Sequence, residues 1–116
     1  MLTPLEKAAL DMLLDRPGEP YGSLRQQLTH ASVAKRDFTG VGFFTEFALP
    51  ADAPVRRDLP DTTIHDVGAD VVGVEHGVGF VLFVRAGVIS VLEGYTYTGA
   101  WPEVTDEFRV YRLQTA

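Results

Sequence analysis

The sequence contains no cysteine, so it offers no disulfide framework, no thiolate ligand for a metal and no cysteine nucleophile. Basic residues are outnumbered: ten lysines and arginines stand against sixteen aspartates and glutamates, a formal net charge of −6. Because a phosphate backbone attracts basic surfaces, we expect no nucleic-acid binding. The longest apolar run, residues 78–84, is too short to cross a bilayer, and we see no signal peptide. We therefore expect a cytoplasmic protein that does not bind a membrane.

What the chain does contain is typical of a folded globular protein. Of its 116 residues, 46% are apolar and 22% are charged, which is ordinary for a protein with a hydrophobic core. That length favours a single domain over residues 1–116.

The most informative stretch is residues 70–97, which we interpret as three consecutive strands joined by two tight turns. The turns are predicted at His76-Gly77 and Ala86-Gly87, where glycine tolerates the positive φ that a hairpin requires. Residues 78–84 are apolar on both alternating faces. A strand with no polar face is usually central, so we expect this one to be covered on both sides.

Two helices are predicted before the strands. Thr3, Pro4 and Glu6 form the T-x-x-E pattern of a capping box with proline at the first helical position, and Pro17-Gly18 ends that helix. A second, shorter helix is expected from Pro20 to about His30.

The remaining segments alternate or break. Residues 35–49 are interpreted as one long strand, bent or bulged at its glycines, and residues 50–60 as a proline-rich loop. Residues 62–66 are predicted as a short edge strand and residues 108–113 as the last strand. The predicted fold class is α+β: two N-terminal helices packed on a curved, mainly antiparallel sheet of four to six strands.

Motifs of known chemistry are absent or incomplete. The sequence GVGF at residues 40–43 and 77–80 precedes no helix and lacks the rest of a phosphate loop, so we interpret its glycines as strand features. His30, His65 and His76 lack the spacing of metal ligands. We expect no metal site and no cofactor.

Catalytic sets can be assembled only from scattered residues. Ser32 or Ser90 could be combined with His65 and Asp61 or Asp66, but no G-x-S-x-G elbow presents either serine. Glu46 and Glu93 lie in predicted strands and could act as acid and base, yet nothing in the sequence brings them together. No catalytic residue is predicted, and whether the protein is an enzyme stays open, with a non-enzyme favoured.

The candidate binding residues are aromatic or basic. Tyr95 and Tyr97 share a sheet face, Trp101 follows after a short loop, and such aromatics are common at protein interfaces. The alternative is that they close the edge of the core. Arg56 and Arg57, in the proline-rich loop, could bind an acidic partner or a phosphate, or be merely solvated.

Several of these motifs together resemble a known group. The pattern R-D-F-T-G-V-G-F-F-T at residues 36–45, then G-F-V-L-F-V, a turn, L-E-G-Y-T-Y and W-P, is similar to a group of small bacterial proteins with no assigned function. The resemblance covers residues 36–102 and implies no activity. Size and acidic charge are also similar to those of bacterial immunity proteins, which neutralise a partner toxin, although likeness at that level does not confer function.

Two hypotheses of function follow. The first is a non-enzymatic protein-interaction domain, of which an immunity protein would be one form, that binds a protein partner or a second copy of itself through a sheet face or residues 95–101. The second is a small-ligand-binding protein or small enzyme with a pocket between the helices and the sheet, closed by the loop at residues 50–60.

Overall fold

The computed structural model describes residues 1–113 and shows two helices at the start of the chain. Helix α1 (Pro4–Leu13) begins with the predicted capping box: the Glu6 amide donates to Thr3 Oγ1, and the Thr3 amide donates to Glu6 Oε1. Helix α2 (Tyr21–His30) follows after a connection that contains Pro17 and Gly18, with Pro20 at its N-cap. Both helices lie where the sequence predicts them.

The six strands form one sheet in which every neighbouring pair is antiparallel. Its spatial order is β1-β2-β5-β4-β3-β6, so β5 and β4 are central to the sheet, with β2 beside β5 and β3 beside β4. The strands are β1 (Ser32–Phe38), β2 (Gly42–Ala48), β3 (Thr62–Val71), β4 (Val78–Arg85), β5 (Val88–Thr96) and β6 (Phe108–Arg112). The predicted α+β class, two helices on an antiparallel sheet, is confirmed.

The prediction of one strand over residues 35–49 is wrong, because this segment contains the turn of a hairpin between β1 and β2. Strands β1 and β2 pair with each other, and the turn between them closes through a hydrogen bond from the Thr39 amide to the Gly42 carbonyl, at 2.9 Å. Gly40 has a φ of +90°, which favours glycine over all other residues. Gly40, which we interpreted as a bend or bulge within one strand, therefore lies in the turn where the chain reverses direction.

The predicted edge strand at residues 62–66 is also too short. Strand β3 continues to Val71, and β6 pairs with its second half, from Val67 onward, so only the first half lacks this neighbour. Consequently residues 70–97 contain the end of β3, then β4 and β5, rather than three whole strands. The turns at Gly77 and Gly87 are present, with φ of +77° and +75°.

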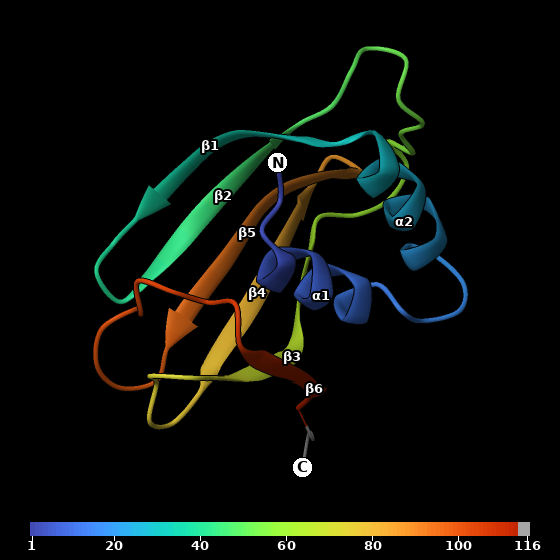
Figure 1. Cartoon of the computed structure of the whole chain (residues 1–116). Helices are drawn as coiled ribbons and strands as arrows, with labels where there is room; N and C mark the ends of the chain where they lie inside the picture. Colours follow the sequence, from blue (N-terminus) through green and yellow to red (C-terminus); the bar gives the residue numbers. More distant parts are fainter. Residues whose placement is uncertain (114–116) are drawn as a thin grey trace.

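Both helices lie on one face of the sheet, and the core fills the space between them and the strands (Figure 1). Helix α1 packs on β3, β4 and β6, and helix α2 packs on β5. Leucines dominate the helical side of the core. The fully buried apolar residues of the helical segment and of β4 are Leu5, Ala9, Leu10, Leu13, Leu14, Leu24, Val78, Phe80, Leu82 and Val84.

The expectation that β4 is covered on both sides is wrong for the part of the chain that the structure describes. Phe80 and Leu82 point to the helices and are fully buried, whereas Val81 and Phe83 point to the opposite side and are half-buried. No helix within residues 1–113 lies on that opposite side. A strand in a sheet of this kind can be apolar on both faces while only one of them is packed in the monomer.

Candidate interaction surface

The uncovered side of the sheet carries an apolar and aromatic surface, which we call the open face. Register places Phe44 of β2 opposite Glu93 of β5, and Glu93 opposite Val81 of β4. Side chains of a strand alternate between the two faces, so every second residue joins this set. The open face comprises Phe44, Glu46, Val81, Phe83, Val91, Glu93, Tyr95, Tyr97 and Tyr111.

Three tyrosines form one end of the open face. The rings of Tyr95 and Tyr97 meet edge to face with centroids 5.5 Å apart, a favourable arrangement for aromatic pairs. They lie over Gly79, where an added Cβ would approach within 2.6 Å of the Tyr95 ring and 2.8 Å of the Tyr97 hydroxyl. Tyr111 contacts Gly68 and Gly77 in the same way. The second GVGF motif therefore provides room for tyrosine rings, as expected for strand glycines that allow close aromatic packing.

Burial perturbs the hydroxyls of this tyrosine group. Desolvation raises the pKa of Tyr97, and the neighbouring Tyr95 contributes to the same shift. Desolvation also raises the pKa of Tyr111, helped by the nearby Asp70 carboxylate. The hydroxyl groups of Tyr97 and Tyr111 are therefore neutral at ordinary pH and can donate or accept hydrogen bonds.

Trp101 lies on the other side of the sheet from Tyr95 and Tyr97. Its ring meets Phe43 edge to face at 5.1 Å, and Phe43 points into the core. Trp101 is partly buried there and lines a small notch of about 160 Å³ with Glu6 and Arg36. The structure therefore brings two of the three predicted aromatics together and separates the third from them.

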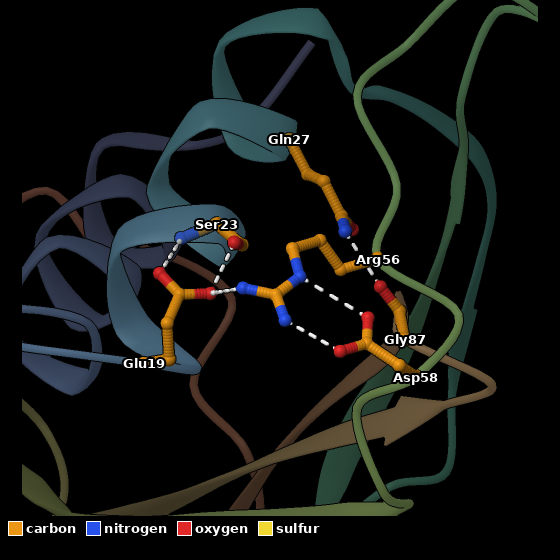
Figure 2. A network of polar contacts seen from close by, with 6 residues as sticks. All are labelled: Glu19, Ser23, Gln27, Arg56, Asp58 and Gly87. Carbon is orange, nitrogen blue, oxygen red and sulfur yellow. Dashed lines mark hydrogen bonds and ion pairs between the residues drawn. The ribbon is translucent and has the colours of Figure 1, made fainter.

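Arg56 is part of a polar network that joins the proline-rich loop to the start of α2 (Figure 2). Its Nη1 donates to Glu19 Oε2 at 3.5 Å, and its Nε donates to Asp58 Oδ1 at 3.1 Å. The Asp58 carboxylate raises the pKa of Arg56, and Arg56 lowers the pKa of Asp58. Arg57 is exposed on the same loop, so of the two arginines only Arg57 is placed away from this network.

The same region contains a contact that the sequence does not reveal. Gln27 is fully buried, and its side chain bridges the β4–β5 turn. Its Nε2 donates to the Gly87 carbonyl at 2.6 Å (Figure 2). The Ile89 amide donates to Gln27 Oε1 at 2.9 Å. The loop backbone at Arg56 passes close to Gly87: a Cβ added at Gly87 would lie 1.9 Å from the carbonyl oxygen of Arg56. Helix α2, the loop and the turn are therefore locked together.

A cleft of about 420 Å³ lies beside the first half of β3. Two arginines, Arg16 and Arg112, contact the Asp66 carboxylate at its floor, and Arg112 Nη1 is 2.9 Å from Asp66 Oδ2. Tyr21 and the exposed His65 complete its walls. The space between the helices and the sheet is filled by the leucine core, and this peripheral cleft is one of several surface hollows with room for a small ligand.

The remaining candidates are distributed as follows. Glu46 and Glu93 lie on neighbouring strands of the open face and are diagonal neighbours there. Glu46 is opposite Val91, which is two residues before Glu93 on β5. Within residues 1–113, no group of three or more histidines, aspartates and glutamates is arranged to hold a metal ion. No helix of that range is long and apolar enough to span a membrane.

Alternation along the sequence is enough to place Phe44, Glu46 and Ala48 on one face of a strand. Alternation does not show which strands pair. The pairing is what brings Phe44, Val81 and Tyr111 into one surface. No protein-family profile, no curated protein and no solved structure matches the chain. The resemblance to the group of small bacterial proteins stays a prediction.

Proposed function

We propose that the chain is a non-enzymatic, cytoplasmic protein-interaction domain and that its open face is the contact surface. The observation that carries this proposal is the aromatic and apolar character of a sheet face on which no described helix packs. Contiguous apolar patches framed by polar residues mark protein contacts, and tyrosine is enriched at their centres. An immunity protein would be one form of such a domain.

The test compares two matched valine substitutions. Val81 lies on the open face, whereas Val104 is 62% exposed on the loop before β6 and belongs to no strand. Wild type, V81S and V104S would each be used as bait in a lysate of the source cells, after thermal melts confirm that all three are folded. We expect one stoichiometric partner that V104S retains and V81S loses.

Recovery of the bait alone, or equal capture by both variants, would contradict the proposal. The separation of the aromatics adds a second comparison. Tyr97→Ala removes a ring that is 47% exposed on the open face, and Trp101→Ala removes one on the helical side. Loss of the partner with Trp101→Ala only would move the contact surface to the helical side.

Small-ligand binding is the second candidate, and the cleft beside β3 favours it. Arg16, Arg112 and Tyr21 could bind an anionic or planar compound there, although Asp66 already neutralises part of the cationic charge. A ligand of this site should raise the melting temperature with its concentration. An Arg112→Gln variant should lose that shift, and a panel of metabolites without any shift would count against this function.

A further inference from the structure

Glu93 occupies the centre of the open face and has no hydrogen-bond or ion-pair partner within residues 1–113. Phe44 and Val81 flank it on the neighbouring strands, and Val91 and Tyr95 precede and follow it on the same side of β5. Burial among these side chains raises the pKa of Glu93, and no hydrogen bond or nearby cation contributes an opposing shift. A carboxylate held in an apolar patch without a counter-ion is a marker of a functional site.

The other charged groups of this face leave its centre acidic. Glu46, on β2, is a second carboxylate beside Glu93. Lys35 lies opposite Glu46 on β1, but the Lys35 ammonium is 3.3 Å from Asp37. Arg85 lies over the ring of Phe83, with 5.3 Å between its guanidinium carbon and the ring centroid.

At the far end of the face, Arg109 is bound to Asp70 at 2.7 Å. The cations of the face are therefore at its margins and engaged, whereas Glu93 and Glu46 lie together near the middle.

We propose that the open face binds a basic, apolar protein surface, with a lysine or arginine of the partner between Glu93 and Glu46. This inference rests on the proposed function and specifies the chemistry of the partner. Desolvating a lone carboxylate costs free energy, and a partner's cation would offset that cost, whereas a neutral partner would bury the charge unpaired. The apolar side chains around Glu93 would exclude water from the ion pair.

The same geometry argues against a second copy of this chain as the occupant. A twofold axis through the middle of the open face would set Glu93 opposite Glu93 of the other copy, and each chain carries a formal net charge of −6. Like charges brought together in a desolvated contact oppose binding. A basic partner meets no such opposition.

The experiment is an NMR titration of the ¹⁵N-labelled full chain with two short synthetic amphipathic peptides, one of leucine and lysine and one of leucine and glutamate. We expect the lysine peptide to shift amides of β2, β4 and β5 around Glu93, and the glutamate peptide to leave them in place. E93Q should weaken binding of the lysine peptide about fivefold or more. The control is E75Q, which removes the same charge from a turn where the side chain is 83% exposed, and should change binding less than about twofold.

The outcomes separate this inference from the proposed function. Equal binding of both peptides at the open face would overturn the requirement for a cation and leave the interaction surface standing. Shifts that gather on the helical side, or none at the open face with either peptide, would overturn both. An equal effect of E75Q and E93Q would show that the peptide responds to the net charge of the chain and not to Glu93. A wild-type dimer in sedimentation that becomes tighter in E93Q would identify a second copy as the occupant. Either result overturns the inference.

Discussion

Arg36 of β1 donates from Nη2 to Glu6 Oε1 of α1 at 2.5 Å, joining the first helix to the edge of the sheet across thirty residues of chain. Arg36 Nε reaches the second oxygen at 3.2 Å, and the buried Thr45 hydroxyl also donates to it. The Glu6 side chain is 2% exposed. One carboxylate therefore completes the helix cap and binds the sheet at the same time.

Glu6→Gln should destabilise the fold by about 2 kcal/mol, because the amide cannot accept all four hydrogen bonds and leaves the Arg36 charge without its partner. Urea unfolding of wild type and variant would measure the difference. Lys7→Ala is the control, since the Lys7–Asp11 pair is exposed on the same helix and should cost less than about 0.5 kcal/mol. Equal losses in both variants would mean that the Glu6 contacts add nothing beyond a surface pair.

The role of Glu6 also shows where sequence analysis stops. The capping box follows from Thr3 and Glu6 three residues apart, which is local information, and the helix begins there as predicted. The ion pair with Arg36 depends on how α1 packs against β1, which no local pattern encodes.

The same limit applies to the sheet and the surface. Turns at Gly77 and Gly87 were predictable because each needs only neighbouring residues, whereas the pairings of β2 with β5 and of β3 with β6 join distant segments. The hairpin at Gly40 was missed because a glycine in a segment of this kind is compatible with a bend or with a reversal, and only the pairing of Phe38 with Phe43 distinguishes the two. Tyr95 was found as a candidate, but the set that surrounds Glu93 comes from three strands and required the register.

The stability of the protein should fall in acid through Glu6. Burial alone would favour its neutral form, but hydrogen bonds from Arg36, the Thr3 amide and Thr45 hold the pKa of Glu6 below its ordinary value of 4.5. A carboxylate with a lowered pKa in the folded state stabilises the fold above the unfolded-state value, and this contribution is lost as the pH falls through the folded-state pKa. Urea midpoints measured from pH 7 to pH 3 should decline below about pH 4.5 in wild type, and less steeply in Glu6→Gln. The same decline in both proteins would mean that other carboxylates cause the loss of stability in acid.

Gln27→Ala should cost about 2–3 kcal/mol, since it leaves the Gly87 carbonyl and the Ile89 amide buried without partners. Gln26→Ala is the matched control: the neighbouring side chain on the same helix is exposed, so the substitution should change the free energy of unfolding by less than about 0.5 kcal/mol. Hydrogen exchange should locate the loss at the β4–β5 turn. Unchanged protection of the Ile89 amide in Gln27→Ala would show that the bridge does not hold this turn.

Gly42→Ala should disrupt the pairing of β2 with β5. An added Cβ would lie 2.0 Å from the Gly94 carbonyl oxygen, which is backbone and cannot rotate away, so we expect a loss of about 3 kcal/mol or more. Gly40→Ala provides the comparison. An added Cβ at Gly40 has no atom within 4 Å, so the substitution should cost only the strain of a positive φ, about 1–2 kcal/mol. Thermal melts would rank the stability of the two variants. A smaller loss for Gly42→Ala than for Gly40→Ala would mean that β2 and β5 do not approach each other closely at Gly42.

Glu93→Gln should act in the opposite direction from the core variants and stabilise the free protein at neutral pH. Burial raises the pKa of Glu93 in the folded state, so its charge opposes folding above the unfolded-state value of 4.5, and the neutral amide removes that cost. Because the side chain is partly solvated, we expect a gain below about 1 kcal/mol at pH 7 that shrinks toward zero below pH 4.5. Urea unfolding at pH 7 and pH 4 would test both parts. A loss of stability at pH 7 would show that the Glu93 carboxylate has a favourable contact within the fold, and the face would then have no reason to require a partner's cation.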